Sequence, residues 1–254
     1  MLLAERQERV RELLEGKQWL SVNELSALLE VSPSTVRRDL IELEQAGVLV
    51  RTRGGARLAL PLPEEFSGAM RSQKHKEEKE RIGRVAARLV ENGGSIILDG
   101  GTTTLEVARV LEPVTPLRVI TDSIEIAYEF RDRKNVIVVV TGGIMRSRAY
   151  NLFGAIAEQT LSGMHAEICV MGASALSLEE GLTKHDIEAL PVRKKFLEIS
   201  RNLLVVCDSS KFNCTGLASV CPVTSINKLV TDPGIDPAFM KELEKHGVQV
   251  IIAD

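Results

Sequence analysis

The chain has 254 residues, with 44% hydrophobic and 26% charged side chains, a formal net charge of −3 and a mean hydropathy of +0.03. This length suits one large domain or two ordinary ones, and the composition excludes both a disordered chain and a membrane-embedded one. A globally basic surface is also excluded, so any contact with nucleic acid has to come from a local patch.

The first residues, MLLAERQERV, include a charge at Glu5 and lack the apolar core of a signal peptide. We therefore expect a cytoplasmic protein with no membrane partner. The four cysteines form no CxxC pair, and no histidine stands at zinc-ligand spacing from them. We expect free cysteines, no metal site and no cofactor.

Residues 1–58 are rich in charges and in leucines at helical spacing, which predicts three helices. Ser21 followed by Glu24 is a capping-box pattern at the start of the second helix. Ser32 can cap the third helix, and Pro33 fits its first position, where no N–H bond is lost. A strand, a glycine turn and a second strand follow in VLVRTRGGARLAL. Three helices and such a hairpin are typical of a winged helix-turn-helix domain.

Polar residues that point away from this predicted core are candidates for contacting DNA. Because an apolar stripe of the third helix packs inward, the exposed start of that helix can reach base edges and phosphates. The hairpin arginines surround a glycine pair, where the backbone can approach a phosphate closely. The candidate DNA-binding residues are Ser32, Ser34, Thr35, Arg37, Arg38, Arg51, Arg53, Gly54 and Gly55. The alternative for Arg37 and Arg38 is a solvated helix face, since residues 1–60 hold nine basic and nine acidic side chains.

The segment SPSTVRRDLIELEQAG, followed by RTRGGA, resembles the most recognisable stretch of the DeoR family of bacterial transcriptional regulators. The resemblance spans residues 3–58 and implies a DNA-binding domain, which we place at residues 1–58. Two prolines bracket Leu62, so we expect a linker over residues 59–75. A second domain is expected at residues 76–254.

This second region alternates short β-branched runs with helical segments. The strand-like runs are SIILD, LRVIT, NVIVVV, AEICVMGA, LLVVCDSSK, NKLVTD and VQVIIAD. The alternation predicts a Rossmann-like α/β domain, in which helices cover both faces of a mostly parallel sheet. Sheets of this kind bind ligands in loops beyond the carboxyl ends of their strands.

The loop DGGTTT, from Asp99 to Thr104, follows one of these strands and opens a helix. Its glycines let the backbone approach an anion, and its threonine hydroxyls lie beside free helix N–H groups. It lacks the lysine of a Walker loop and the GxGxxG spacing, which disfavours ATP and NAD and leaves small phosphorylated ligands. The alternative is an ordinary β–α turn with a threonine cap.

Two further polar loops are predicted at the same edge of the sheet. Asp122 follows the strand LRVIT, and Lys211 follows the strand LLVVC in the run DSSK. Lys211 either neutralises a phosphate or is an ordinary surface lysine. We interpret the run from Arg193 to Lys195 as a solvated helix face.

Residues 76–252 resemble the DeoR-type sensor domain, which is similar in fold to ribose-5-phosphate isomerase. DGGTTT matches the phosphate loop of that family and DSSKF matches its late loop, while TGG, Gly154 and GLT stand where the family has them. The resemblance implies a sugar phosphate effector held by Asp99, Gly100, Gly101, Thr102, Thr103, Thr104, Asp122 and Lys211. The family commonly has asparagine in place of Asp122, and Lys-Arg in place of Arg193-Lys194. Either the effector therefore differs from that of other members, or Asp122 does not touch it.

Together the resemblances imply a transcriptional regulator. We expect a repressor of a carbohydrate catabolic operon, which a phosphorylated sugar releases from double-stranded operator DNA. Paired half-sites in an operator imply a homo-oligomer, either a dimer or a tetramer. The alternative is a phosphosugar isomerase-like enzyme with an accessory DNA-binding domain. It is disfavoured because the stretch MGASALSLEEG lacks the acidic DGADE-type loop of such isomerases, and we assign no catalytic residue.

Overall fold

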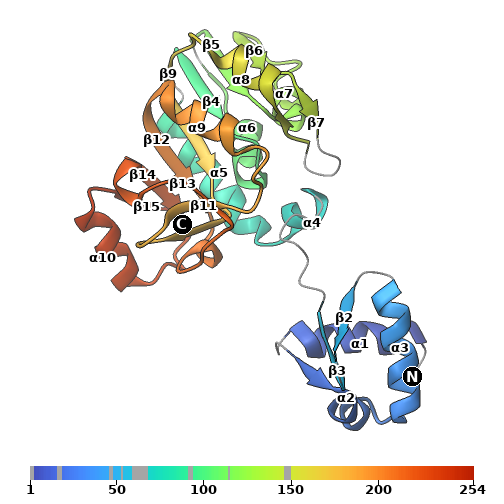
Figure 1. The fold of residues 1–254 in the computed structure, drawn as a ribbon. Helices are drawn as coiled ribbons and strands as arrows, with labels where there is room; N and C mark the ends of the chain where they lie inside the picture. Colours follow the sequence, from blue (N-terminus) through green and yellow to red (C-terminus); the bar gives the residue numbers. More distant parts are fainter. Residues whose placement is uncertain are drawn as a thin grey trace. The chain divides into compact units, whose positions relative to one another are not determined.

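The computed structural model describes residues 3–15, 19–45, 48–52, 54–58, 68–90, 94–113, 115–145 and 150–254. The chain divides into two compact units, Met1–Phe66 and Ser67–Asp254 (Figure 1). Of the segment predicted as a linker, residues 59–67 lie outside the described residues. The helix α4 (Gly68–Gln73) follows them. Within the described ranges, no helix has the length and apolarity needed to cross a membrane.

The first unit has the three helices and the hairpin predicted from the sequence. Its elements are α1 (Leu3–Glu15), β1 (Leu20–Ser21), α2 (Val22–Leu29), α3 (Pro33–Gln45), β2 (Leu49–Thr52) and β3 (Gly55–Leu58). The strands form one antiparallel sheet in the order β1-β3-β2. The two-residue strand β1 was not predicted. It adds a third strand to the sheet by pairing with β3, the second strand of the hairpin.

Local side-chain chemistry explains where these elements begin. The Ser21 hydroxyl accepts a hydrogen bond from the Glu24 amide at 3.1 Å, and the Glu24 carboxylate accepts one from the Ser21 amide at 2.8 Å. This is the predicted capping box. The hairpin turn needs its glycines, because Gly54 has a φ of +90° and a Cβ on Gly55 would lie 2.3 Å from the Leu20 carbonyl oxygen.

A buried ion pair fixes the orientation of α3 against α1. The Arg6 guanidinium donates to both carboxylate oxygens of Asp39, with Nε 2.5 Å from Oδ2 and Nη2 3.0 Å from Oδ1. Asp39 is buried, and a paired fork of this kind restricts geometry more than a single bond does. The face of α3 opposite Asp39 is therefore exposed to solvent.

The second unit is an α/β domain. Its helices are α4, α5 (Lys76–Val90), α6 (Thr102–Val110), α7 (Ile124–Glu129), α8 (Ala155–Leu161), α9 (Leu190–Glu198) and α10 (Pro237–Lys245), with the 3₁₀ turns η1 (Ser209–Lys211) and η2 (Val223–Ser225). Its strands are β4 (Ser95–Leu98), β5 (Leu117–Thr121), β6 (Val136–Val140), β7 (Ile144–Met145), β8 (Leu152–Phe153), β9 (Ala166–Gly172), β10 (Ala175–Ser177), β11 (Gly181–Lys184), β12 (Ser200–Val206), β13 (Ala218–Cys221), β14 (Lys228–Thr231) and β15 (Gln249–Ile252).

Seven of these strands form a parallel sheet in the order β15-β14-β12-β9-β4-β5-β6. The central strand pairs place Ile97 beside both Ile120 and Cys169. A smaller antiparallel sheet, β10-β11-β13, was not predicted as a unit. The larger sheet confirms the predicted α/β fold class, and it brings the loops after β4, β5, β12 and β14 to one edge.

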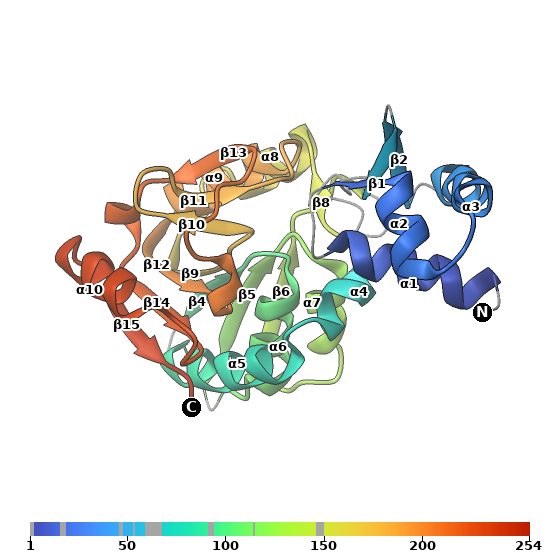
Figure 2. The same cartoon turned by 90° about the horizontal axis from the view of Figure 1, so that it is seen from below.

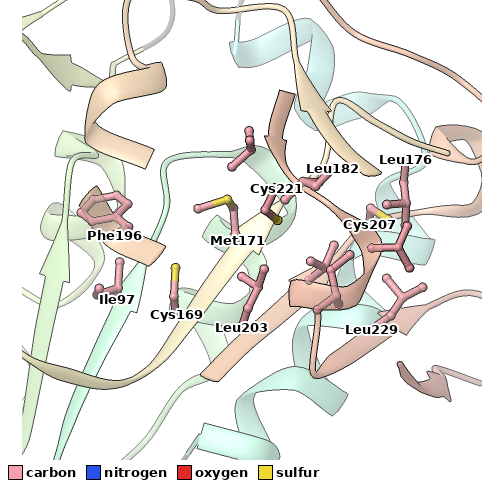
Figure 3. Packing of buried hydrophobic residues seen from close by; sticks show 14 of the residues in the cluster. Ile97, Cys169, Met171, Leu176, Leu182, Phe196, Leu203, Cys207, Cys221 and Leu229 are labelled. Carbon is pink, nitrogen blue, oxygen red and sulfur yellow. The ribbon is translucent and has the colours of Figure 1, made fainter. Parts of the chain in front are cut away.

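Alternate residues of the strands pack into two cores, one on each face of the large sheet. Ile97 joins the core that includes Phe196 of α9 (Figure 3), whereas Ile96 and Leu98 join the core beneath α5 and α6. This alternation follows from the two-residue period of a strand. Cys169, Cys207 and Cys221 are buried and Cys214 is exposed, all as free thiols.

Candidate functional site

The loop after β4 is held by a buried ion-pair network. Asp99 is fully buried, and its carboxylate accepts from Lys184 Nζ at 2.9 Å and from Arg193 Nε at 3.2 Å. Lys184 ends β11, and Arg193 lies on the inner face of α9. Burial lowers the pKa of Lys184 from its usual value, while the charge of Asp99 opposes that shift. The network joins three separate parts of the chain at the foot of this loop.

The prediction of a solvated helix face is wrong for Arg193. Its side chain is only 5% exposed and bonds to the buried carboxylate of Asp99. Lys194 is exposed, and Lys195 forms an ion pair with Glu198 at 2.9 Å, so the outer face of the helix is as expected. In this run of three cationic residues, the sequence did not show that Arg193 points inward.

Asp122 supports the loop from beneath. Its side chain is fully buried, with Oδ1 accepting from the Gly100 amide at 2.8 Å and Oδ2 accepting from Asn151 Nδ2 at 3.1 Å. Asn151 also donates to the Gly100 carbonyl at 3.2 Å, and a Cβ on Gly100 would lie 2.2 Å from its amide nitrogen. The close approach of the Asn151 side chain leaves no room for a Cβ at position 100. Asp122 bonds to the backbone of the loop at the same residue.

Burial raises the pKa of Asp122 to about 6, and the negative charge of Asp99 adds to the effect. Since the native carboxyl binds its proton more tightly than the unfolded one, the free energy of unfolding should fall as pH rises from about 4 to 6. The Asp122→Asn variant lacks this dependence. We expect its stability relative to wild type to rise by on the order of 2 kcal/mol between pH 4 and 7.

Urea unfolding followed by circular dichroism at several pH values measures this difference. Asp132→Asn, at an exposed position paired with Arg131, is the control that should stay parallel to wild type. Parallel curves for Asp122→Asn would show that Asp122 keeps an ordinary titration.

The three threonines of the loop have different environments. Thr104 is buried, and its hydroxyl donates to the carbonyls of Asp99 at 2.6 Å and Gly101 at 2.9 Å. Thr102 is half-buried and Thr103 is 8% exposed. The helix α6 begins without a side-chain cap, so the N–H groups of its first turn face the loop opening. This opening suits an anion.

The loop after β12 carries Lys211. Asp208 caps the 3₁₀ turn η1 by accepting from the Ser210 amide at 3.2 Å, and Lys211 is half-buried at the end of that turn. Asp232, which follows β14, accepts from the Ser209 amide at 2.6 Å. Lys211 therefore lies on a fixed loop at the same edge of the sheet as DGGTTT.

The start of α3 presents the candidate DNA-contacting residues. The Ser32 hydroxyl caps this helix by accepting from the Thr35 amide at 3.2 Å. Ser34, Arg37 and Arg38 are exposed, while Thr35 is half-buried. Arg38 lies 3.8 Å from Glu42, at the limit of an ion pair, with its side chain 84% exposed.

On the hairpin, Arg51 is held within the domain by Glu44, with Nε 2.7 Å from Oε2. Hydrogen bonds from the Arg51 side chain and backbone hold the pKa of Glu44 below its usual value. Gly54 and Gly55 form the turn, and Arg53 lies outside the described residues. Arg51 would have to leave Glu44 in order to contact a phosphate.

The site also contains residues that the sequence did not suggest. Lys184, Arg193 and Asn151 contact the DGGTTT loop and Asp122 from far along the chain. The available signal for Lys184 was its place directly after the run GLT. The signal for Arg193 was the departure of Arg193-Lys194 from the Lys-Arg of the family, and no local pattern marked Asn151. Within the described residues there is no cluster of His, Cys, Asp or Glu that could hold a metal ion.

Both units match known families. Residues 6–60 match the DeoR-like helix-turn-helix domain, and residues 74–233 match the DeoR C-terminal sensor domain. Three curated relatives are similar over nearly their whole length. GolR of Listeria innocua is 35% identical over 98% of both chains. The repressor AccR of Agrobacterium fabrum is 31% identical over 98% of this chain and 97% of its own. The repressor GlcR of Bacillus subtilis is 30% identical over 100% of this chain and 98% of its own.

Among solved structures, ribose-5-phosphate isomerase A of Methanocaldococcus jannaschii matches 55% of each chain, with 17% identity and a TM-score of 0.40. A similarity of this degree carries no conclusion about activity.

Proposed function

The chain belongs to the DeoR family of transcriptional regulators, and from this premise we propose that it is a repressor that a phosphorylated sugar releases from its operator. Two of the relatives, AccR and GlcR, are named as repressors. We place the effector on the loop from Asp99 to Thr104, and we take the regulated genes to be a carbohydrate catabolic operon.

One observation carries the effector assignment. The uncapped first turn of α6 opens beside a backbone that Asp122 and Asn151 hold in place. Lys184 and Arg193 pair with Asp99, Arg193 also pairs with Asp186 at 3.5 Å, and Lys211 lies at the same edge of the sheet. Free N–H groups at the start of a helix, with a lysine at the same edge of the sheet, favour an anion such as a sugar phosphate.

A thermal-shift panel tests the assignment. We expect one or more sugar phosphates to raise the melting temperature of the wild-type chain, because a ligand that binds only the native state stabilises it. The corresponding free sugars should have little effect. No shift with any pentose or hexose phosphate would overturn the proposal.

DNA recognition is assigned to the start of α3. Removing an arginine that contacts a base should weaken operator binding by about 1–3 kcal/mol and reduce specificity. Removing one that contacts a phosphate should weaken all sequences equally and flatten the salt dependence. Arg37→Ala and Arg38→Ala in a gel-shift assay measure these losses, with the exposed Arg9→Ala of α1 as control. If both variants keep wild-type affinity, this assignment is wrong.

We infer that the domain does not catalyse isomerisation, although the alternative of a phosphosugar isomerase-like enzyme uses the same loop. The stretch from Gly172 to Gly181 contains two glutamates near its end, both exposed, and no buried carboxylate that could serve as a base. Purified protein incubated with pentose and hexose phosphates should show no interconversion above background. Turnover that disappears in Lys211→Ala would support the enzyme instead.

The remaining organisation is proposed in the same terms. Residues 1–58 bind DNA, residues 59–75 join the domains, with α4 of the second unit inside that segment, and residues 76–254 bind the effector and assemble the protein. A dimer or tetramer in the cytoplasm would place two winged helices on paired half-sites.

A further inference from the structure

A buried lysine in the first turn of α5 connects this helix to α4. Lys79 is only 5% exposed, and its ammonium donates to the main-chain carbonyls of Arg71 and, at 2.6 Å, of Lys74. These carbonyls belong to the last turn of α4 and the residue just beyond it. The ammonium therefore ties α4 to α5 from the inside.

The helix α6 contacts both α4 and α5. α5 and α6 lie side by side (Figure 2), and a Cβ on Gly83 would lie 2.8 Å from the Glu106 Cβ. Lys79 precedes Gly83 by one turn of helix. Lys79 thus lies one turn from the contact of α5 with α6, the helix at whose uncapped start the effector is placed.

The loop after β12 reaches the same place. Burial lowers the pKa of Lys79 to about 8, while the charge of Asp208 opposes this shift and that of Lys211 adds to it. Asp208 is only 2% exposed, and its Oδ2 has no hydrogen-bond partner within the described part of the chain. A buried ammonium and an unpaired buried carboxylate oxygen thus stand at the edge of the effector site.

We propose that Lys79 transmits effector binding to α4: the phosphate draws the ammonium away from the carbonyls of Arg71 and Lys74, and α4 is released from α5. This inference rests on the proposed function. The phosphate carries negative charge and a main-chain carbonyl does not, so the phosphate attracts the ammonium more strongly and can compete for it. Arg71 and Lys74 are exposed residues, so water can reach this corner once the ammonium has moved away. α4 is the helix through which the chain enters the sensor unit.

Hydrogen exchange of the full chain, with and without saturating inorganic phosphate, tests this step. In wild type we expect phosphate to slow exchange at residues 100–105 and to speed exchange at residues 70–79 by at least about fivefold, the lower end of typical allosteric coupling. In Lys79→Met, residues 70–79 should exchange fast without phosphate and respond no further. Lys76→Met, at an exposed position of the same helix, should behave as wild type.

Lys79→Gln keeps an amide that can donate to one carbonyl but has no charge. Residues 70–79 should then stay slow and unresponsive, which keeps the test informative if the methionine variant folds poorly. Slowed exchange at residues 100–105 without faster exchange at residues 70–79 in wild type would overturn this inference alone. A Lys79→Gln chain that still responds would overturn it as well. If neither phosphate nor any sugar phosphate slows residues 100–105, the proposed function fails and this inference fails with it.

Discussion

Replacing Asp99 with asparagine is expected to lower the free energy of unfolding of the sensor unit by about 3–5 kcal/mol. The carboxylate is fully buried and pairs with Lys184 and Arg193, whose side chains are 7% and 5% exposed. The variant removes the carboxylate that pairs with both buried cations, and within the described residues Arg193 keeps an ion pair with Asp186 at 3.5 Å. Uncompensated buried charge is among the most destabilising changes that one substitution can cause.

The single tryptophan of the chain makes this effect measurable in the intact protein. Trp19 lies in the first unit, so its fluorescence reports that unit, whereas circular dichroism reports mainly the larger second unit. We expect Asp99→Asn to shift the urea transition in circular dichroism and to leave the fluorescence transition in place. Asp132→Asn removes an exposed ion pair and should cost less than about 1 kcal/mol. An unchanged circular dichroism transition for Asp99→Asn would contradict the role given to the network.

Removing the groups that hold the phosphate is expected to give a repressor that cannot be induced. The typical coupling between an effector and a second ligand is about 1–3 kcal/mol, which corresponds to a roughly 5–150-fold loss of DNA affinity in wild type. Lys211→Ala, or Thr102→Val combined with Thr103→Val, should keep wild-type DNA affinity and abolish this loss. The effector has to bind the DNA-free state more tightly than the DNA-bound state, and these variants remove the bonds that provide the difference.

Fluorescence anisotropy with labelled operator DNA measures both the DNA affinity and its loss when the effector is added. Lys241→Ala changes an exposed lysine of α10, and Thr160→Val changes a half-buried threonine of α8. Both controls should respond as wild type. If the loop variants still release DNA at the wild-type effector concentration, the effector binds elsewhere.

The sequence predicted best the elements that local chemistry defines. The capping box at Ser21, the cap at Ser32 and the glycine turn at Gly54 each depend on neighbouring residues alone, and all three appear in the structure. The parallel sheet was also predictable, because strands covered on both faces are apolar throughout. The small sheet β10-β11-β13 was not, since its strands are short and one of them comes from a distant segment.

The candidate site was predictable only in part, for a similar reason. A glycine-rich loop after a buried strand can be recognised from the sequence. Its partners Lys184 and Arg193, however, follow Asp99 by 85 and 94 residues. The fold alone brings them together. Asp122 was a candidate ligand because of its place after β5, and its contacts with Gly100 and Asn151 in the structure support the loop. Only three-dimensional structure distinguishes a carboxylate under a loop from one that faces into it.

The most direct test of the central claim compares a sugar phosphate with its own free sugar on the complex with DNA. Operator duplexes can be selected from a random library by the purified protein and then titrated by anisotropy. We predict that a sugar phosphate from the stabilising set dissociates the complex, that the matching free sugar does not, and that Lys211→Ala stays bound in both cases. Equal release by the free sugar, or no release by any phosphate that binds the protein, would contradict the account.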